Sequence, residues 1–276
     1  MTSDVTRAAS GSVKLLAPRP VAPQKPLFVF LPGMDGAGTL LRPQVDRLVP
    51  WFDVRCVAIS ADDGSEWVPL AQQVIRLIRQ EIDDESDEER QNRSTRRRSV
   101  YLCGESFGGC LAMQVLTLSP DLFERIILIN PASSFRRLPW MHIGPLLTRQ
   151  LPSIAYQYSS RGLVPFLIEP FRVARRDRKA LEEAMGAVPA KTAAWRMGLL
   201  SKFEVERLPL ERMNHPVLLM AGGSDRLLPS KREVKSLQGR FPNAQLTLLP
   251  KSGHACLLET EVNLQKILRQ HGFLAP

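Results

Sequence analysis

Ser106 lies at the centre of the sequence Gly-Glu-Ser-Phe-Gly at 104–108, where its hydroxyl could act as a nucleophile. The apolar run before this motif predicts a strand, and residues 107–118 after it predict a helix. A tight strand–turn–helix connection holds a serine at its apex, over the end of a sheet. Gly104 and Gly108 suit such a turn, because the backbones on its two sides approach too closely for side chains.

A serine hydroxyl needs a base to accept its proton, and the base needs an acid to orient it. Asp225 ends a Gly-rich turn after the apolar run 217–221, and His254 follows the last apolar run of the chain. Ser, Asp and His occur in the chain order that this kind of site uses. Each residue comes just past the carboxyl end of an expected strand, the edge where ligands collect in parallel sheets. We therefore predict Ser106 as nucleophile, His254 as base and Asp225 as the orienting acid.

Each partner also has a plainer interpretation. Asp225 could be a turn residue or a helix cap, and His254 could be a surface histidine. Of the four histidines, however, His254 is the one in a loop after a strand and C-terminal to both serine and acid, away from the chain end. The joint arrangement therefore favours the catalytic interpretation.

A Gly-rich loop follows the apolar run 27–31 and begins with Pro32 and Gly33. A loop of this kind after an early strand can supply a backbone N–H that stabilises an oxyanion. We expect the amide N–H groups of Met34 and Phe107 to form this pair. Phosphate binding is the alternative for the loop, but no Lys-Ser/Thr follows it and the Gly-x-Gly-x-x-Gly spacing is absent.

With these motifs the chain resembles an α/β-hydrolase. More narrowly, it resembles the hydrolase domain of the esterase/lipase/thioesterase family that includes the plastid phytyl ester synthases and their cyanobacterial relatives. The resemblance is carried by residues 31–38, 104–112 and 130–135, with weaker support from 191–196 and 252–254. Plant members carry a second domain of the glycerolipid acyltransferase type, marked by His-x-x-x-x-Asp. Since no histidine here starts that motif, we expect any acyl transfer to pass through Ser106.

The wider pattern predicts an α/β fold with a mostly parallel sheet, helices on both faces and an inserted helical lid. The leading antiparallel strands of a full hydrolase sheet are expected to be missing or rudimentary. Expected strands are 27–31, 53–58, 99–103, 126–130, 217–221 and 245–249, and expected helices are about 39–48, 67–82, 107–118, 229–239 and 256–270. We divide the chain into a disordered tail (1–26), a hydrolase core (27–135 and 215–276) with a charged flexible insertion (83–98), and a lid (136–214).

Charge and cysteine content bound the partners and the compartment. The formal net charge is +9, and residues 136–212 hold fourteen Lys/Arg against seven Asp/Glu. A basic, apolar-rich lid is expected to touch an anionic membrane surface, although a solvated basic face explains the same composition. No nucleic-acid motif accompanies the charge, so no nucleic acid is expected. Four cysteines without metal spacing indicate free thiols and a cytoplasmic location, or a plastid in a eukaryote.

The function expected from these residues is hydrolysis of a hydrophobic carboxylic ester or thioester through an acyl-enzyme, with no metal or cofactor. One alternative is transfer of a fatty acyl group to phytol or another lipid alcohol, which product analysis with added alcohol would separate from hydrolysis. Another is a non-catalytic, ligand-binding protein on a hydrolase fold, which would fail to react with serine-directed probes.

Overall fold

The computed structural model describes residues 12–84, 97–137 and 162–274. Most of the charged insertion expected at 83–98 lies outside the described residues, as do residues 138–161 of the expected lid and the first 11 residues.

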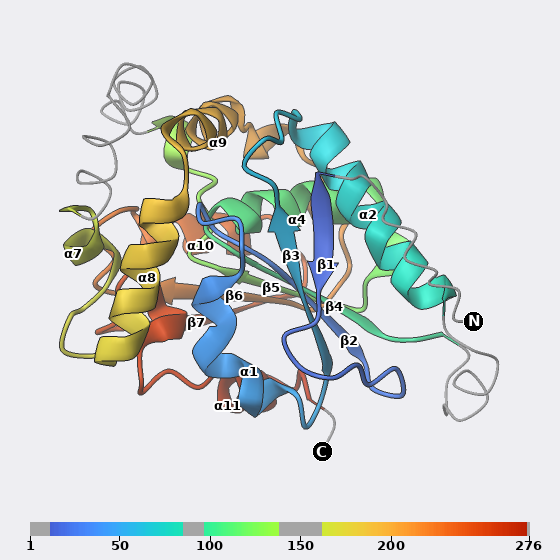
Figure 1. Cartoon of the computed structure of the whole chain (residues 1–276). Helices are drawn as coiled ribbons and strands as arrows, with labels where there is room; N and C mark the ends of the chain where they lie inside the picture. Colours follow the sequence, from blue (N-terminus) through green and yellow to red (C-terminus); the bar gives the residue numbers. More distant parts are fainter. Residues whose placement is uncertain (1–11, 85–96, 138–161, 275–276) are drawn as a thin grey trace, which may run out of the picture.

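In the described part of the chain, seven strands form one sheet in the order β1-β3-β2-β4-β5-β6-β7 (Figure 1). β1 runs antiparallel to β3, and every other neighbouring pair is parallel. This arrangement confirms the predicted mostly parallel α/β-hydrolase sheet. The strands are β1 (Val13–Leu16), β2 (Leu27–Leu31), β3 (Asp53–Ile59), β4 (Val100–Glu105), β5 (Arg125–Ile129), β6 (Val217–Gly222) and β7 (Ala244–Leu249).

Helices cover both faces of the sheet. One hydrophobic core joins the sheet to α2, α4 and α10, and a second core joins its other face to α1 and α11. Among the described residues between β5 and β6, three more helices occur in the region predicted to be a lid (Figure 1). The helices are α1 (Arg42–Leu48), α2 (Trp67–Asp83), α4 (Phe107–Leu118), α7 (Val164–Leu167), α8 (Arg175–Ala187), α9 (Ala190–Lys202), α10 (Ser230–Gln238) and α11 (Leu264–Gln270).

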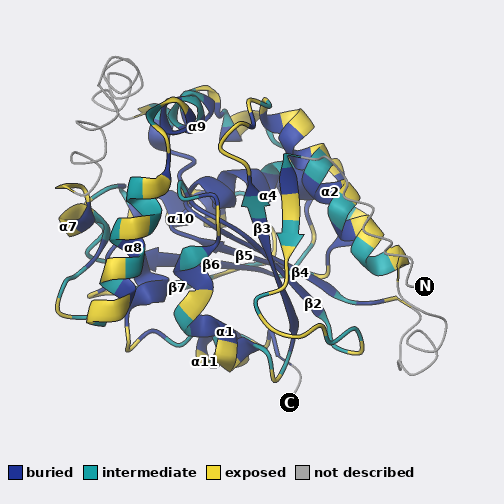
Figure 2. Ribbon diagram, viewed as in Figure 1, coloured by how far each residue is buried: buried dark blue, intermediate teal, exposed yellow. Residues whose placement is uncertain are grey.

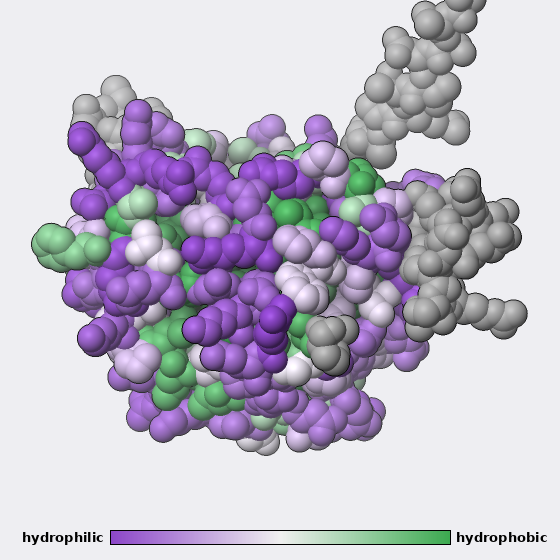
Figure 3. All heavy atoms as spheres, turned by 90° about the horizontal axis from the view of Figure 1, so that it is seen from below, coloured by the Kyte–Doolittle hydropathy of each residue, from purple (hydrophilic) through white to green (hydrophobic). Residues whose placement is uncertain are grey.

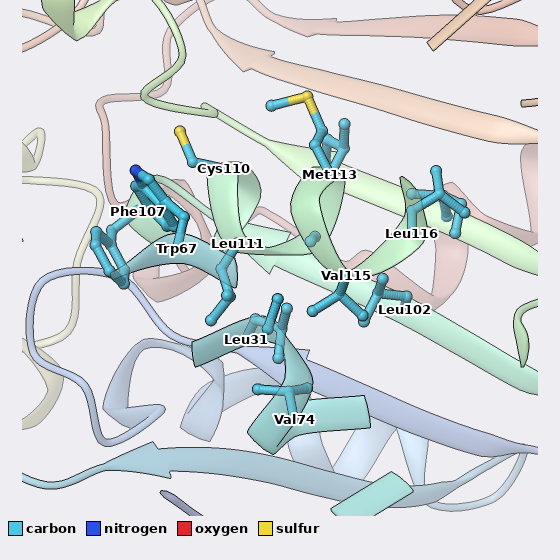
Figure 4. Close-up of a cluster of buried hydrophobic side chains, with 14 of the residues drawn as sticks. Leu31, Trp67, Val74, Leu102, Phe107, Cys110, Leu111, Met113, Val115 and Leu116 are labelled. Carbon is cyan, nitrogen blue, oxygen red and sulfur yellow. The ribbon is translucent and has the colours of Figure 1, made fainter. Parts of the chain in front are cut away.

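The central strands are mostly apolar because helices bury both of their faces. β4 is an example: Leu102 packs into the core with α2 and α4, and Tyr101 and Cys103 pack into the core with α1 and α11. Figure 2 shows these strands buried throughout. In Figure 4, Phe107 of α4 lies against Trp67 of α2, and the two rings stack with centroids 5.0 Å apart. This contact anchors the helix that follows Ser106.

Two expectations about elements were wrong. Residues 13–16, expected within a disordered tail, form β1, whose first residue Val13 is buried against the core. The single helix expected over 256–270 is instead a short 3-10 turn at Cys256–Leu258 followed by α11. The separate helix starts at Asn263, whose side chain accepts a hydrogen bond from the amide of Lys266 at 2.9 Å.

The four cysteines are buried and unpaired, as the sequence predicts. Among the helices of the described segments, none has the length and apolar character needed to cross a bilayer.

Candidate active site

Ser106 occupies the tight turn between β4 and α4. Its φ of 55° and ψ of −115° are strained for a residue with a side chain. A Cβ at Gly104 would lie 2.2 Å from the carbonyl oxygen of Gly108, and a Cβ at Gly108 would lie 2.0 Å from that of Leu31. Both glycines are therefore required by the close approach of backbones, which is the role the sequence predicts for them.

The structure brings the three residues of the predicted triad together at the carboxyl edge of the sheet. The Nε2 atom of His254 lies 2.9 Å from the hydroxyl oxygen of Ser106, and its Nδ1 atom lies 2.7 Å from Oδ2 of Asp225. Ser106 follows β4, Asp225 follows β6 and His254 follows β7. Ser106 is 7% exposed and His254 is 3% exposed, so bulk water has little access to the pair.

The carboxylate of Asp225 is buried, and both of its oxygens accept hydrogen bonds from the protein. The amides of Leu227 and Leu228 donate to Oδ1 at 2.8 and 3.0 Å, and the hydroxyl of Ser230 donates to Oδ2. Burial raises the pKa of Asp225, but the neighbouring His254 and these hydrogen bonds lower it by more, so it ends below its ordinary value. The group is therefore ionised at neutral pH and suited to hold a proton on Nδ1 of the imidazole.

The loop after β2 lies beside the turn that holds Ser106, because Leu31 pairs with Gly104 in the sheet. Among the described residues, neither the amide N–H of Met34 nor that of Phe107 donates a hydrogen bond. The guanidinium of Arg196, from α9, donates to the carbonyl of Met34. These features leave both N–H groups without an acceptor among the described residues, and the Arg196 hydrogen bond holds the next peptide of the loop, Met34–Asp35.

Two buried carboxyl groups lie behind the serine. Both oxygens of Glu105 and one oxygen of Asp35 have no hydrogen-bond partner among the described residues. Burial raises the pKa of Glu105 well above its ordinary value, and the neighbouring Asp35 raises it further. Burial also raises the pKa of Asp35, although hydrogen bonds from the amides of Thr39 and Ala37 lower it in part. The neutral form of Glu105 is therefore favoured in the residue that precedes Ser106.

Asn130, at the end of β5, connects two of the loops that form the site. Its Nδ2 donates to the carbonyl of His254, and its Oδ1 accepts from the amide of Gly222 at 2.8 Å. The residue is fully buried and has a φ of 43°, a left-handed conformation that asparagine tolerates better than most residues. It thus joins the strand before Asp225 to the loop of His254.

A groove of about 1250 Å³ in the described part of the chain does not include Ser106 or His254. It is lined by Asp35, Thr39 and residues of β1, β3 and α8. We assign the candidate site from the hydrogen-bonded side chains, because reaction chemistry requires that geometry and the groove offers no nucleophile–base pair.

The sequence analysis missed Asn130, Arg196 and Glu105 as parts of the site. Asn130 and Glu105 each end an apolar strand, the same position that identifies Ser106, so a polar residue at a strand end is the signal that could have found them. Arg196 gives no such signal, since only folding brings α9 to the loop after β2.

Comparison with known proteins shows similarity to two plant phytyl ester synthases. The chain is 29% identical to phytyl ester synthase 1, chloroplastic, of Arabidopsis thaliana, over 98% of this chain and 40% of that protein. It is 25% identical to phytyl ester synthase 2, chloroplastic, of the same plant, over 90% of this chain and 38% of that protein. The chain thus spans about two fifths of the length of these curated relatives.

A solved structure with the same fold is the enol-lactonase from Burkholderia xenovorans LB400. It superposes with a TM-score of 0.73 over 95% of both chains at 14% sequence identity. The sequence pattern of the alpha/beta hydrolase family matches residues 28–263. The chain is therefore an enzyme of the alpha/beta hydrolase family.

Proposed function

We propose that this protein is a serine hydrolase acting on hydrophobic carboxylic esters or thioesters, with Ser106 as nucleophile, His254 as general base and Asp225 as its orienting acid. The observation that carries the proposal is the hydrogen-bonded series from the serine hydroxyl through the imidazole to the carboxylate, with distances of 2.9 and 2.7 Å. The strained turn at Ser106 supports it, because such strain at a reactive residue is a frequent feature of active sites.

In the proposed reaction, Nε2 of His254 takes the hydroxyl proton as the Ser106 oxygen bonds to the substrate carbonyl carbon. The carbonyl oxygen becomes an oxyanion facing the amide N–H groups of Met34 and Phe107. The intermediate then expels the alkoxide or thiolate, which leaves with the proton held on His254. The acyl group stays on the serine oxygen.

A water molecule completes hydrolysis by the same steps. His254 removes a proton from the water as its oxygen bonds to the acyl carbon, and the serine oxygen leaves with that proton. Asp225 balances the imidazolium charge in both halves of the reaction. Its lowered pKa supports this role, since a carboxylate must remain ionised to do so.

Acyl transfer is the second candidate, and one observation favours it. The similarity to two phytyl ester synthases runs over nearly the whole chain, and the names of those proteins describe ester formation. In this version phytol or another lipid alcohol replaces water in the second half of the reaction. The shielded site, with His254 only 3% exposed, is consistent with some exclusion of water. We also propose that the protein is located in the cytoplasm, or in a plastid if its source is a eukaryote, and that it contacts lipid peripherally.

The test compares wild type, Ser106→Ala and a control, Ser236→Ala, on acyl esters and acyl thioesters of graded chain length, with and without phytol. Ser236 is an exposed residue of α10, so its variant should retain wild-type turnover. Mass spectrometry of free acid and new ester separates hydrolysis from transfer. Ser106→Ala should lose about 10⁴-fold or more in kcat and keep the wild-type melting temperature. An undiminished rate in Ser106→Ala would refute the assignment of the nucleophile.

A further inference from the structure

Residues 163–173, which we call the docking arm, combine an exposed apolar surface with direct attachment to the catalytic loops. The arm contains α7 and the connection to α8. Its outward side chains are Leu163, Phe166 and Phe171, which are 45, 50 and 102% exposed. These are three of the eight large apolar side chains that are exposed in the described residues, gathered in nine positions of the chain. Such a concentration is unusual for a surface that faces only water.

The rest of the described surface lacks a comparable concentration. The other exposed apolar side chains are spread over the chain, at Leu16, Val21, Val68, Leu118 and Leu248. The face seen from below, over α1 and α11, is mostly hydrophilic with small separate apolar patches (Figure 3). The apolar character of the arm is therefore local.

Positive charge lies next to the apolar side chains. Arg175 and Arg176 begin α8 directly after the arm and are exposed. The nearby acidic groups are largely neutralised within the protein: Glu169 pairs with Arg226 at 2.6 Å, and Asp177 is buried against Arg42 at 2.7 Å. An apolar patch bordered by exposed arginines is complementary to a lipid surface with anionic head groups.

The inner side of the arm is fastened to the loop of His254. The carbonyl of Leu167 accepts from the amide of Ala255 at 2.8 Å, and the carbonyl of Arg172 accepts from the amide of Thr260 at 2.9 Å. The guanidinium of Arg172 also donates to Glu259 at 2.8 Å. Glu259 in turn accepts hydrogen bonds from Ser252 and Gly253, which immediately precede the histidine.

The arm also contacts the loop of the catalytic acid. Arg226, the neighbour of Asp225, donates to the carbonyl of Pro165 at 3.1 Å and to the carboxylate of Glu169. Beneath the arm, Val164 and Ile168 are buried together with Ala255 and Leu258. Any surface that binds the outer side chains would therefore lie directly over the loops that carry the base and the acid.

We propose that the docking arm binds the surface of a lipid phase containing anionic head groups, with Phe166 and Phe171 inserting and Arg175 and Arg176 contacting the head groups. The inference deepens the proposed function and rests on it, since it explains how an ester dissolved in lipid would reach the site. The proposed contact is peripheral, through side chains of the docking arm.

The experiment measures partitioning of the full chain onto phosphatidylcholine vesicles with and without phosphatidylglycerol. We expect wild type to bind the anionic vesicles more tightly and the double variant Phe166→Ser/Phe171→Ser to bind at least about tenfold more weakly, because even partial burial of two phenyl rings contributes that much. Removing each arginine, as in Arg175→Gln, should weaken binding about fivefold at low salt. Leu118→Ser, a similarly exposed residue of α4, should bind like wild type.

Three results would overturn the inference: no binding of wild type to anionic vesicles, equal binding of the phenylalanine variant, or concentration-dependent self-association that the same variant abolishes. Melting temperatures show whether each variant is folded. The Ser106→Ala protein should bind vesicles like wild type, so vesicle binding is read independently of turnover. An inactive wild type that still binds through the phenylalanines would refute the proposed function and leave the docking inference standing.

Discussion

Replacing Asn130 by alanine should destabilise the protein and disable the site together. The substitution removes the donor to the carbonyl of His254 and the acceptor for the amide of Gly222, and both groups are in buried surroundings. Each buried polar group without a partner costs about 1–3 kcal/mol. Alanine at a φ of 43° adds about 1 kcal/mol, because a side chain without local hydrogen bonds disfavours the left-handed region. The expected loss is therefore about 3–7 kcal/mol of unfolding free energy.

Urea unfolding of a small set of variants separates these contributions. Asn130→Gly removes the same hydrogen bonds but accepts the left-handed backbone, so it should be about 1 kcal/mol less destabilised than Asn130→Ala. Asn130→Asp keeps an acceptor for Gly222 and loses the donor to His254. The matched control is Asn243→Ala, since that exposed amide donates one hydrogen bond of 2.9 Å to a backbone carbonyl and its loss should cost about 1 kcal/mol or less.

Steady-state kinetics at a temperature where every variant is folded measures the effect of each substitution on activity. If Asn130 positions the loop of His254, kcat should fall by about a hundredfold in Asn130→Ala while KM changes much less, because the base is displaced from the serine hydroxyl. Asn243→Ala should keep the wild-type kcat. A variant at position 130 with wild-type kcat, or with an unfolding free energy within about 1 kcal/mol of wild type, would refute the reasoning.

Three further predictions concern other residues around the candidate site. Asp225→Asn should lower kcat about ten-thousandfold in steady-state turnover, because an amide holds the wrong imidazole tautomer, and should change the melting temperature little. A loss of kcat below about tenfold would contradict this prediction. Burial holds the pKa of Glu105 well above its ordinary value, so the stability that the neutral carboxyl contributes is fully present below pH about 4.5 and is lost as the pH rises through the raised pKa. In urea titrations, the unfolding free energy of wild type should therefore fall relative to that of Glu105→Gln by up to about 1.4 kcal/mol per pH unit. Parallel pH curves for the two proteins would contradict this prediction. Gly108→Ala should lower the unfolding free energy by about 3–5 kcal/mol, because its Cβ would meet the carbonyl of Leu31. A Cβ at Gly198 in α9 would meet nothing within 4 Å, so Gly198→Ala should raise the unfolding free energy by up to about 1 kcal/mol. Thermal melts of the two variants measure both changes.

Much of the fold could be predicted because the parallel strands are buried on both faces and therefore appear as uninterrupted apolar runs. β4, β5 and β6 all lie within two residues of their expected bounds. β1 was missed because it has only four residues, too short a run for its alternating burial to stand out in the sequence. Its pairing with β3, which is distant in sequence, provides the order that its own residues do not.

The candidate site divides in the same way. Ser106, Asp225 and His254 could be predicted to lie together because each follows a recognisable strand and each has a side chain that the proposed reaction would use. The contact of Arg196 with Met34 could not be found, because it joins residues 162 positions apart, between which the sequence shows no periodic relation. A long-range hydrogen bond to a backbone carbonyl or amide depends only on where two loops meet after folding.

The residues that break local rules lie around one point of the molecule. Ser106 and Asn130 are the two described residues other than glycine with positive φ, and Glu105 has a buried carboxyl group without hydrogen-bond partners. Each feature is unfavourable by itself, and the surrounding sheet and helices must compensate for it. Conflicts between local preference and the overall fold are expected where a structure has been selected for activity instead of stability. Their convergence on the carboxyl ends of β4 and β5 therefore supports this edge as the reaction site, independently of the Ser–His–Asp hydrogen bonds.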